Sequence, residues 1–304
     1  MSETESEPQG VDSLEFWERA AEGWGRRAER IRDWGMPVSA ALIDALALQP
    51  GQRVLELAAG PGDTGFLAAE LVKLPDDSRA ARSGEAGSRA GGIREGTVLS
   101  SDGAEAMVEL ARSRAKAAGI DNVEFRRLEL EWIDLPTASV DAALCRWGIM
   151  LIADREAAAR EIRRVVAPGG RAALAVWDVP DRNPWATIPA QAMIELGHIE
   201  PPDPDAPGMF RLSPAPRLQE LLESAGFVEV AVRPVTLERA YDTVDDYIEE
   251  TLDLSGMLRE ALQSLSDAER EAALEKIRSL AARFTAADGS LRLTGSSLVA
   301  SAAA

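Results

Sequence analysis

The sequence predicts an α/β fold: a doubly wound, mostly parallel sheet of seven strands with a helical cap in its C-terminal part. Three observations support this prediction. Short apolar runs alternate with helical patterns between residues 53 and 177, and a glycine-rich turn follows the first run; after residue 178 the chain is proline-rich and then forms amphipathic helices. Strands that alternate with helices at this spacing are typical of parallel sheets covered by helices.

Local patterns predict the individual elements. Residues 14–48 look helical and are ended by Pro50-Gly51. Pro189 suits the first turn of a helix, and Ser266 with Glu269 forms a capping-box pattern. The expected strands are 53–57, 97–101, 122–128, 140–145, 171–177, 228–235 and 290–300; the expected helices are 63–74, 104–118, 156–166, 188–196, 218–225, 244–265 and 266–284.

Composition narrows the function classes. The formal charge of −18 and the pI near 4.6 argue against nucleic acid or an anionic membrane surface as a partner, since both are bound by Lys and Arg surfaces. The single cysteine, Cys145, excludes an intramolecular disulfide and fits a reducing compartment. No apolar run approaches the length of a membrane span, and the acidic N-terminus is unlike a signal peptide. We therefore expect a soluble cytoplasmic protein, whose oligomeric state the sequence leaves undetermined.

The most informative stretch is residues 54–65, VLELAAGPGDTG, in which a short strand leads into a glycine-rich turn. Gly60, Gly62 and Gly65 match the G-x-G-x-x-G pattern of a dinucleotide site. Such a site also has an acid about 20 residues after the glycines. Here the next acid at a strand end is Asp102, which lies further along the chain than that. An insertion between them accounts for the difference, so spacing alone does not decide between cofactors.

Glu56 adds a charge argument to this pattern. A carboxylate beneath the glycine turn would repel the pyrophosphate of a dinucleotide but would suit a cationic or zwitterionic ligand. S-adenosylmethionine carries a sulfonium and an amino group and has no phosphate. The residues therefore favour S-adenosylmethionine as the cofactor.

At these residues the chain resembles the class I S-adenosylmethionine-dependent methyltransferases, in particular the group of ubiquinone/menaquinone C-methyltransferases. The resemblance covers roughly residues 17–177. The family's first motif, an acid followed by glycines, stands here as Glu56-Leu57-Ala58-Ala59-Gly60-Pro61-Gly62, with Ala58 in place of the family's first glycine. Gly65 then contributes only to helix packing.

The resemblance also assigns the adenosine part of the site. Asp102, followed by Gly103, matches the acid that binds both ribose hydroxyls, and Met107 matches the apolar residue that packs on adenine, although it also suits an ordinary helix core position. The adenine amino group would meet Glu129, with Leu130 supplying a backbone N–H; Glu131 is a close alternative to Glu129.

Two further segments match the family. Residues 145–147, Cys-Arg-Trp, correspond to the segment that touches the methionine part, where Cys145 is the candidate contact; its thiol also suits a buried structural position. Residues 164–170 match a structural turn before the fifth strand. The family's final strand lies antiparallel beside the fifth, which residues 290–300 would supply.

This resemblance implies a Rossmann-like methyltransferase fold and an SN2 transfer of a methyl group to a small, apolar or aromatic molecule. A nicotinamide-dependent oxidoreductase and a non-catalytic S-adenosylmethionine-binding protein are the alternatives. The implied division is a disordered tail (1–12), an N-terminal helical lid (13–48), a cofactor-binding core (49–178) with a flexible insertion (75–96), and a substrate-side segment (179–304) that holds the cap (244–284) and the last strand (290–300).

No catalytic residue is assigned, and no metal site is expected. The candidate general bases, none better supported than the others, are His198, Asp178, Tyr241 and Tyr247. Several large apolar residues lie near the expected strand ends or in the segment after them: Trp147, Trp177, Trp185, Met193 and Met209. They either bind an apolar or aromatic acceptor or simply pack in the core. Trp17 and Trp24 share one helix face, which either packs on the domain or covers a ligand.

Overall fold

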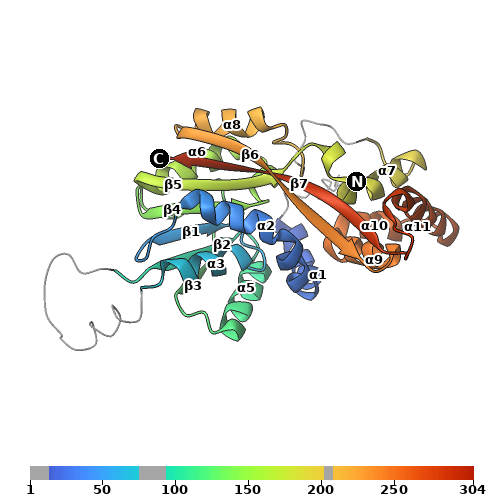
Figure 1. Cartoon of the computed structure of the whole chain (residues 1–304), viewed down its shortest axis with the longest axis horizontal. Helices are drawn as coiled ribbons and strands as arrows, with labels where there is room; N and C mark the ends of the chain where they lie inside the picture. Colours follow the sequence, from blue (N-terminus) through green and yellow to red (C-terminus); the bar gives the residue numbers. More distant parts are fainter. Residues whose placement is uncertain (1–13, 75–93, 202–207) are drawn as a thin grey trace, which may run out of the picture.

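The centre of the molecule is a seven-stranded sheet in the order β3-β2-β1-β4-β5-β7-β6 (Figure 1). The computed structural model describes residues 14–74, 94–201 and 208–304. Strands β1 to β5 are parallel, and β7 lies antiparallel between β5 and β6, which confirms the predicted fold. The strands are β1 Arg53–Leu57, β2 Thr97–Asp102, β3 Val123–Arg127, β4 Val140–Arg146, β5 Val166–Trp177, β6 Val228–Tyr241 and β7 Leu291–Ala303.

Helices pack on this sheet and form the cap. Helix α2 contacts β5, β6 and β7 and packs beside α3, whereas α6 and α8 pack against each other. The predicted tail (1–12) and residues 75–93 of the predicted insertion (75–96) lie outside the described residues. The helices are α1 Leu14–Arg26, α2 Ala28–Leu46, α3 Asp63–Val72, α5 Glu105–Ala118, α6 Arg155–Val165, α7 Pro184–Glu195, α8 Ala215–Ser224, α9 Val244–Leu254, α10 Gly256–Gln263 and α11 Asp267–Ala281.

Strands β6 and β7 continue together past the end of β5. Trp177, the last residue of β5, pairs with Ser297, whereas β6 and β7 remain paired as far as Tyr241 and Leu291. Residues 236–241 and 291–296 thus form a two-stranded extension, called here the β6–β7 ribbon, which leads from the sheet to the cap helices (Figure 1). The prediction that this strand ends at residue 235 was wrong, because Arg239 occupies an inward position and interrupts the apolar alternation.

Two predicted boundaries in the cap-side segment were also wrong. The helix expected at 244–265 is broken at Ser255, which has an extended backbone and caps α10 by accepting from the Leu258 N–H. Helix α7 begins at Pro184, so Pro189 lies in its interior rather than in its first turn. The capping box of Ser266 at the start of α11 is confirmed.

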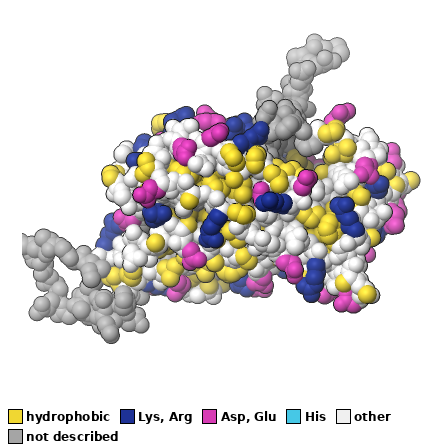
Figure 2. Space-filling view, turned by 45° about the horizontal axis from the view of Figure 1, so that its top comes forward, with side chains coloured by type: hydrophobic (Ala, Val, Ile, Leu, Met, Phe, Trp, Pro, Cys, Tyr) yellow, Lys and Arg dark blue, Asp and Glu magenta, His cyan; other side chains and the backbone are white. Residues whose placement is uncertain are grey.

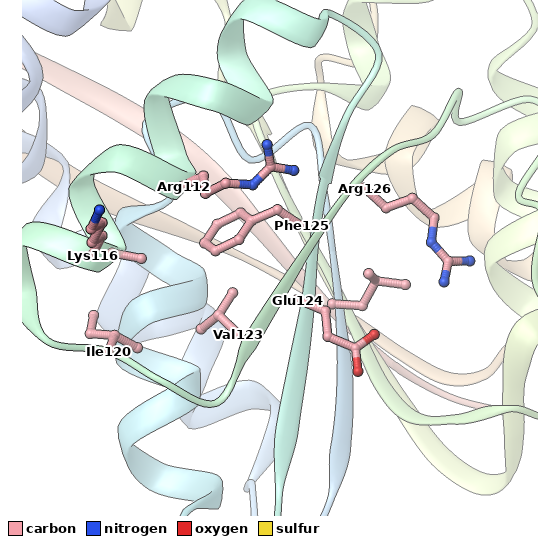
Figure 3. Close-up of a pocket in the computed structure, with 9 residues that line it drawn as sticks. Arg112, Lys116, Ile120, Val123, Glu124, Phe125 and Arg126 are labelled. Atoms are coloured by element: carbon pink, nitrogen blue, oxygen red, sulfur yellow. The ribbon is translucent and has the colours of Figure 1, made fainter.

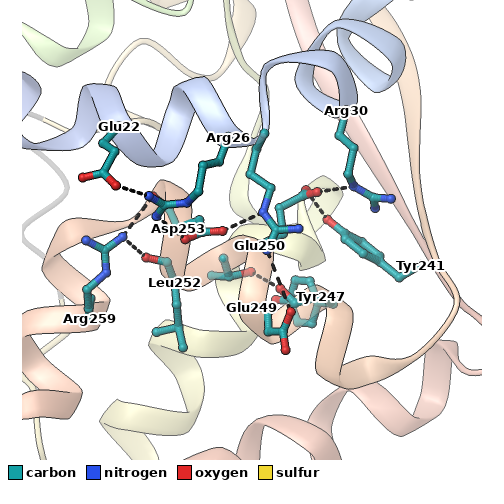
Figure 4. Close-up of polar contacts among 12 residues, drawn as sticks. Glu22, Arg26, Arg30, Tyr241, Tyr247, Glu249, Glu250, Leu252, Asp253 and Arg259 are labelled. Carbon is teal, nitrogen blue, oxygen red and sulfur yellow. Dashed lines mark hydrogen bonds and ion pairs between the residues drawn. The ribbon is translucent and has the colours of Figure 1, made fainter. Parts of the chain in front are cut away.

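Helix α1 lies between α5 of the core and α9 and α10 of the cap. The rings of Trp17 and Trp24 lie 5.7 Å apart, as their shared helix face predicts, and pack with Met107 of α5. On the cap side, Arg26 binds the carboxylate of Asp253 (Figure 4). Arg27 binds the same carboxylate. The N-terminal helices therefore hold the cap against the core.

Acidic and basic side chains are interspersed over the face drawn in Figure 2, despite the formal charge of −18. Many charged residues in the described part of the chain form surface ion pairs within or between helices, such as Arg278 with Asp245. Within the described part of the chain, no helix is long and apolar enough to cross a membrane.

Candidate functional site

The glycine turn after β1 is tightly folded. Ala58 and Gly60 have φ angles of 49° and 52°, and Gly62 has 87°. Ala58 therefore adopts the left-handed conformation that glycine adopts without strain and that costs an L-residue about 1 kcal/mol or more. Its Cβ faces Gly148, where an added Cβ would lie only 2.3 Å away. The turn and the end of β4 thus approach each other as closely as these small residues permit.

Glu56 supports the turn from below. Its carboxyl group accepts hydrogen bonds from the Gly65 N–H (2.6 Å) and the Ser100 hydroxyl (2.7 Å). Gly65 is more than a packing residue, because a Cβ there would lie 2.0 Å from Glu56 Oε2. Burial raises the pKa of Glu56 to about 8 against the opposing effect of these two hydrogen bonds. Both oxygens of Glu56 contact the protein itself.

Asp102 ends β2 beside the same turn. One of its oxygens accepts from the Gly60 N–H (2.9 Å) and the other from the Ala104 N–H (3.1 Å). Burial raises the pKa of Asp102, although these backbone hydrogen bonds act in the opposite direction. Each carboxylate oxygen has two lone pairs, so Asp102 can still accept from two hydroxyl groups.

The other predicted adenosine contacts lie around α5 and the end of β3. Met107 is only 2% exposed because α1 covers it with Phe16. The Leu128 N–H donates to the Asp102 carbonyl, which places the segment after β3 beside β2. Leu130 is buried, whereas the Glu129 side chain is 55% exposed.

The end of β4 supplies a residue that the sequence analysis did not select. Cys145 is fully buried, and burial raises the pKa of its thiol to about 12, so it remains protonated. The next residue, Arg146, donates from Nη1 to the Ser39 hydroxyl (3.1 Å), which lies 3.0 Å from the Thr64 hydroxyl. Burial lowers the pKa of Arg146, and the nearby carboxylates of Asp63 and Glu56 oppose this. The guanidinium group thus lies between α2 and the start of α3.

Four tryptophans, called here the tryptophan cluster, lie beyond the ends of β4 and β5: Trp34, Trp147, Trp177 and Trp185. Trp147 and Trp177 are stacked with centroids 4.3 Å apart, Trp34 stacks on Trp147 at 5.4 Å, and Trp185 meets Trp177 edge-on at 4.7 Å. Trp147 has a φ of 61°, an outlier for a bulky residue that marks a strained position. Sequence reasoning selected three of these residues but had no signal for Trp34, which α2 brings in from the N-terminal region.

The candidate bases are dispersed. His198 follows α7 and lies near Glu269 at the start of α11. Asp178 is buried and bound by Arg182 and Ser296. The hydroxyls of Tyr241 and Tyr247 donate to Glu250 and to the Trp185 carbonyl, and burial raises the pKa of both phenols. Deprotonation of either tyrosine is therefore disfavoured.

A surface hollow of about 580 Å³ lies elsewhere, along the outer edge of the sheet (Figure 3). Its walls come from α5 and β3 and include Arg112, Lys116, Val123 and Phe125. None of the predicted cofactor residues lines it.

Known proteins resemble this chain in sequence and in fold. A family model described as a methyltransferase domain matches residues 84–174. The chain is 25% identical over 198 residues to a ubiquinone/menaquinone biosynthesis C-methyltransferase UbiE of Shewanella frigidimarina, covering 62% of this chain and 71% of that protein. A UbiE of Cronobacter sakazakii is 30% identical over 130 residues, which cover 42% of this chain and 44% of that protein. The structure of YcgJ from Bacillus subtilis superposes with a TM-score of 0.54 at 18% identity, covering 87% of this chain and 97% of that one.

The family match and the sequence similarity to C-methyltransferases identify the chain as an S-adenosylmethionine-dependent methyltransferase. Its fold, with the antiparallel β7, is that of class I. Within that class its sequence is similar to the ubiquinone/menaquinone C-methyltransferases. S-adenosylmethionine is accordingly its cofactor, and the oxidoreductase alternative is set aside.

Proposed function

We propose that this enzyme transfers the methyl group of S-adenosylmethionine to a small aromatic or apolar acceptor bound between the carboxyl edge of the sheet and the cap. The observation that carries the proposal is the tryptophan cluster, which gathers four ring systems beyond the ends of β4 and β5, beside the glycine turn. Indole faces are well suited to hold a flat apolar molecule. The UbiE relatives are named for ubiquinone/menaquinone biosynthesis, and a quinone-type ring belongs to this class of acceptor.

The residues at the glycine turn fit the cofactor. A Cβ at Gly60 would meet no atom within 4 Å, so the backbone there is open to a ligand. Asp102 retains lone pairs for the two ribose hydroxyls. Met107 is kept in the set on the family resemblance, although α1 covers it in this structure. The proposed cofactor-binding set is Glu56, Ala58, Gly60, Gly62, Asp102, Gly103, Met107, Glu129, Leu130 and Cys145.

Arg146 completes this set at the methionine end. Of its guanidinium nitrogens only Nη1 has a hydrogen-bond partner among the described residues, the Ser39 hydroxyl. The nearby Asp63 carboxylate, whose Oδ2 has no hydrogen-bond partner among the described residues, makes the surroundings suitable for an amino group. Arg146 supplies the positive charge that a carboxylate requires. The amino-acid part of S-adenosylmethionine carries both groups.

The bound cofactor supplies a sulfonium methyl that is already electrophilic. The chain then has to align the acceptor with that methyl group and exclude water, and orientation of this kind contributes up to about 7–11 kcal/mol in favourable cases. The tryptophan rings and the cap provide an apolar surface for in-line displacement. Cys145 takes no part as a base because its thiol stays protonated.

Calorimetry with S-adenosylmethionine, S-adenosylhomocysteine and NAD tests the cofactor assignment. The first two ligands should bind and NAD should not, and Asp102→Ala should weaken binding at least tenfold by removing the ribose contact. Failure of both sulfur ligands to bind, or normal binding to Asp102→Ala, contradicts the proposal.

A second titration isolates Arg146. Arg146→Met should weaken S-adenosylhomocysteine binding about tenfold or more, because a charged hydrogen bond is lost, and leave 5′-methylthioadenosine binding unchanged, because that ligand lacks the amino-acid part. Arg112→Met, an exposed change on α5, is the matched control and should alter neither. Equal losses for both ligands would show that Arg146 supports the fold rather than the carboxylate.

A further inference from the structure

Arg239 lies beyond the carboxyl edge of the sheet, on the side where the acceptor is proposed to bind. Val235 of β6 pairs with Ser297, which in turn pairs with Trp177 at the end of β5. Arg239 is four residues further along β6, or about 13 Å at the usual rise of a strand. It pairs with Leu293 in the β6–β7 ribbon, and its side chain is only 3% exposed.

The guanidinium group of Arg239 is inserted into the tryptophan cluster. Its central carbon lies 4.2 Å from the ring of Trp34 and 4.2 Å from the ring of Trp185. These two rings contact Trp147, which follows β4, and Trp177, the last residue of β5. A cation is therefore part of the same aromatic surface that faces the cofactor end of the sheet.

The carboxylate that pairs with Arg239 is shared with a second, half-exposed arginine. Glu250 of α9 is fully buried and accepts from Arg239 (2.9 Å), from Arg30 (2.6 Å) and from the Tyr241 hydroxyl (2.7 Å), as Figure 4 shows for Arg30 and Tyr241. Burial raises the pKa of Glu250, but the two arginines and the phenol outweigh it and keep the group ionised. Two guanidinium groups thus share a single carboxylate.

Two donors at this place have no hydrogen-bond partner among the described residues. They are Arg239 Nε and Trp34 Nε1, and both atoms are enclosed. An unpaired buried donor is costly, and a buried cation needs an anion to offset its lost hydration. A ligand oxygen with negative charge would supply the acceptor that these donors lack.

We propose that the acceptor of this enzyme is an aromatic molecule bearing an anionic oxygen, a carboxylate or a phenolate, that binds at Arg239 and Trp34 Nε1. The inference rests on the proposed function, because it concerns the acceptor of that same site. The ring lies against the tryptophan cluster, and the anionic group serves as an anchor remote from the transferred methyl. Since the indole rings enclose both donors, ligand binding displaces a ring and changes tryptophan fluorescence.

The test uses enzyme saturated with S-adenosylhomocysteine and two probes of equal shape, naphthalene-2-carboxylate and naphthalene-2-carboxamide. Calorimetry and tryptophan fluorescence should show the carboxylate binding at least tenfold more tightly, the ratio expected for charged over neutral hydrogen bonding. Arg239→Met should reduce the ratio to below twofold while S-adenosylhomocysteine still binds. Arg292→Met, an exposed residue of β7 paired with Glu238, is the control and should retain the full ratio.

The wild-type ratio needs no variant, so the proposal remains testable if Arg239→Met does not fold. Trp34→Phe then provides the second measurement: it keeps a ring, removes the unpaired N–H, and should weaken carboxylate binding at least threefold. Equal binding of the two probes, no binding of the carboxylate, or an unchanged ratio in Arg239→Met overturns the inference. Failure of S-adenosylhomocysteine itself to bind would instead contradict the proposed function.

Discussion

Replacing Glu56 with glutamine should remove part of the pH dependence of stability. Glu56 is 2% exposed, and its pKa rises from 4.5 to about 8 on burial. The folded state therefore binds one more proton than the unfolded state between these two values. Stability is lost as the pH rises from about 4.5 to about 8 and is constant above that range, with a slope of about 1.4 kcal/mol per pH unit.

Glutamine matches the shape of the protonated side chain and has no proton to lose. Its carbonyl can accept from the Gly65 N–H, and its amide can face the Ser100 hydroxyl, so the supports of the turn are kept. Between pH 5.5 and 7.5 the free energy of unfolding of the wild type should fall relative to Glu56→Gln by about 2–3 kcal/mol.

Urea unfolding at four pH values across this range measures the difference directly, because all other titrating groups are common to both proteins. Circular dichroism and tryptophan fluorescence should give coincident transitions. Curves that stay parallel to within about 0.5 kcal/mol would show that Glu56 is ionised in the folded protein and would refute the reasoning.

Two further predictions concern small residues. Gly23→Ala should lower the melting temperature by several degrees and weaken S-adenosylhomocysteine binding, because its Cβ would lie 2.1 Å from the Asp253 carbonyl and separate α1 from α9. Gly25→Ala, on the same helix against the flexible Leu110 side chain, is the control and should be neutral or stabilising; equal loss in both variants would contradict the reasoning. The free energy of unfolding of Ala58→Gly should equal that of the wild type to within about 1 kcal/mol, or be slightly higher. Glycine removes the backbone strain of an alanine at φ 49° in the folded state, and this offsets the greater conformational entropy of the unfolded chain. A loss above 1 kcal/mol in chemical unfolding would mean that the methyl contact with Gly148 outweighs the strain.

The parallel part of the sheet was predictable because its signals are local. The range of β1 agrees with the prediction residue for residue, and that of β2 to within one residue, since each is a short apolar run between turns. The ribbon was harder to predict. In TLERAY the inward residues are Leu237, Arg239 and Tyr241, and an arginine at an inward position hides the alternation that marks a strand.

The candidate site shows the same division between local and distant signals. Asp102 and Gly60 were selected from their strand-end positions, and a hydrogen bond joins them; their binding of the cofactor stays a prediction. Arg146 and Arg239 were not, because their importance comes from contacts with Ser39, Trp34 and Glu250, which lie far away in sequence. A charged residue looks like a surface residue until its neighbours are known.

The position of β7 has a consequence for synthesis. This strand fills the gap between β5 and β6, yet it follows every other described strand along the chain. Until its residues leave the ribosome, β5 keeps an open edge and β6 has no place in the sheet. An exposed strand edge attracts other chains, so a nascent or truncated molecule lacking residues 291–303 should depend on chaperones and aggregate readily.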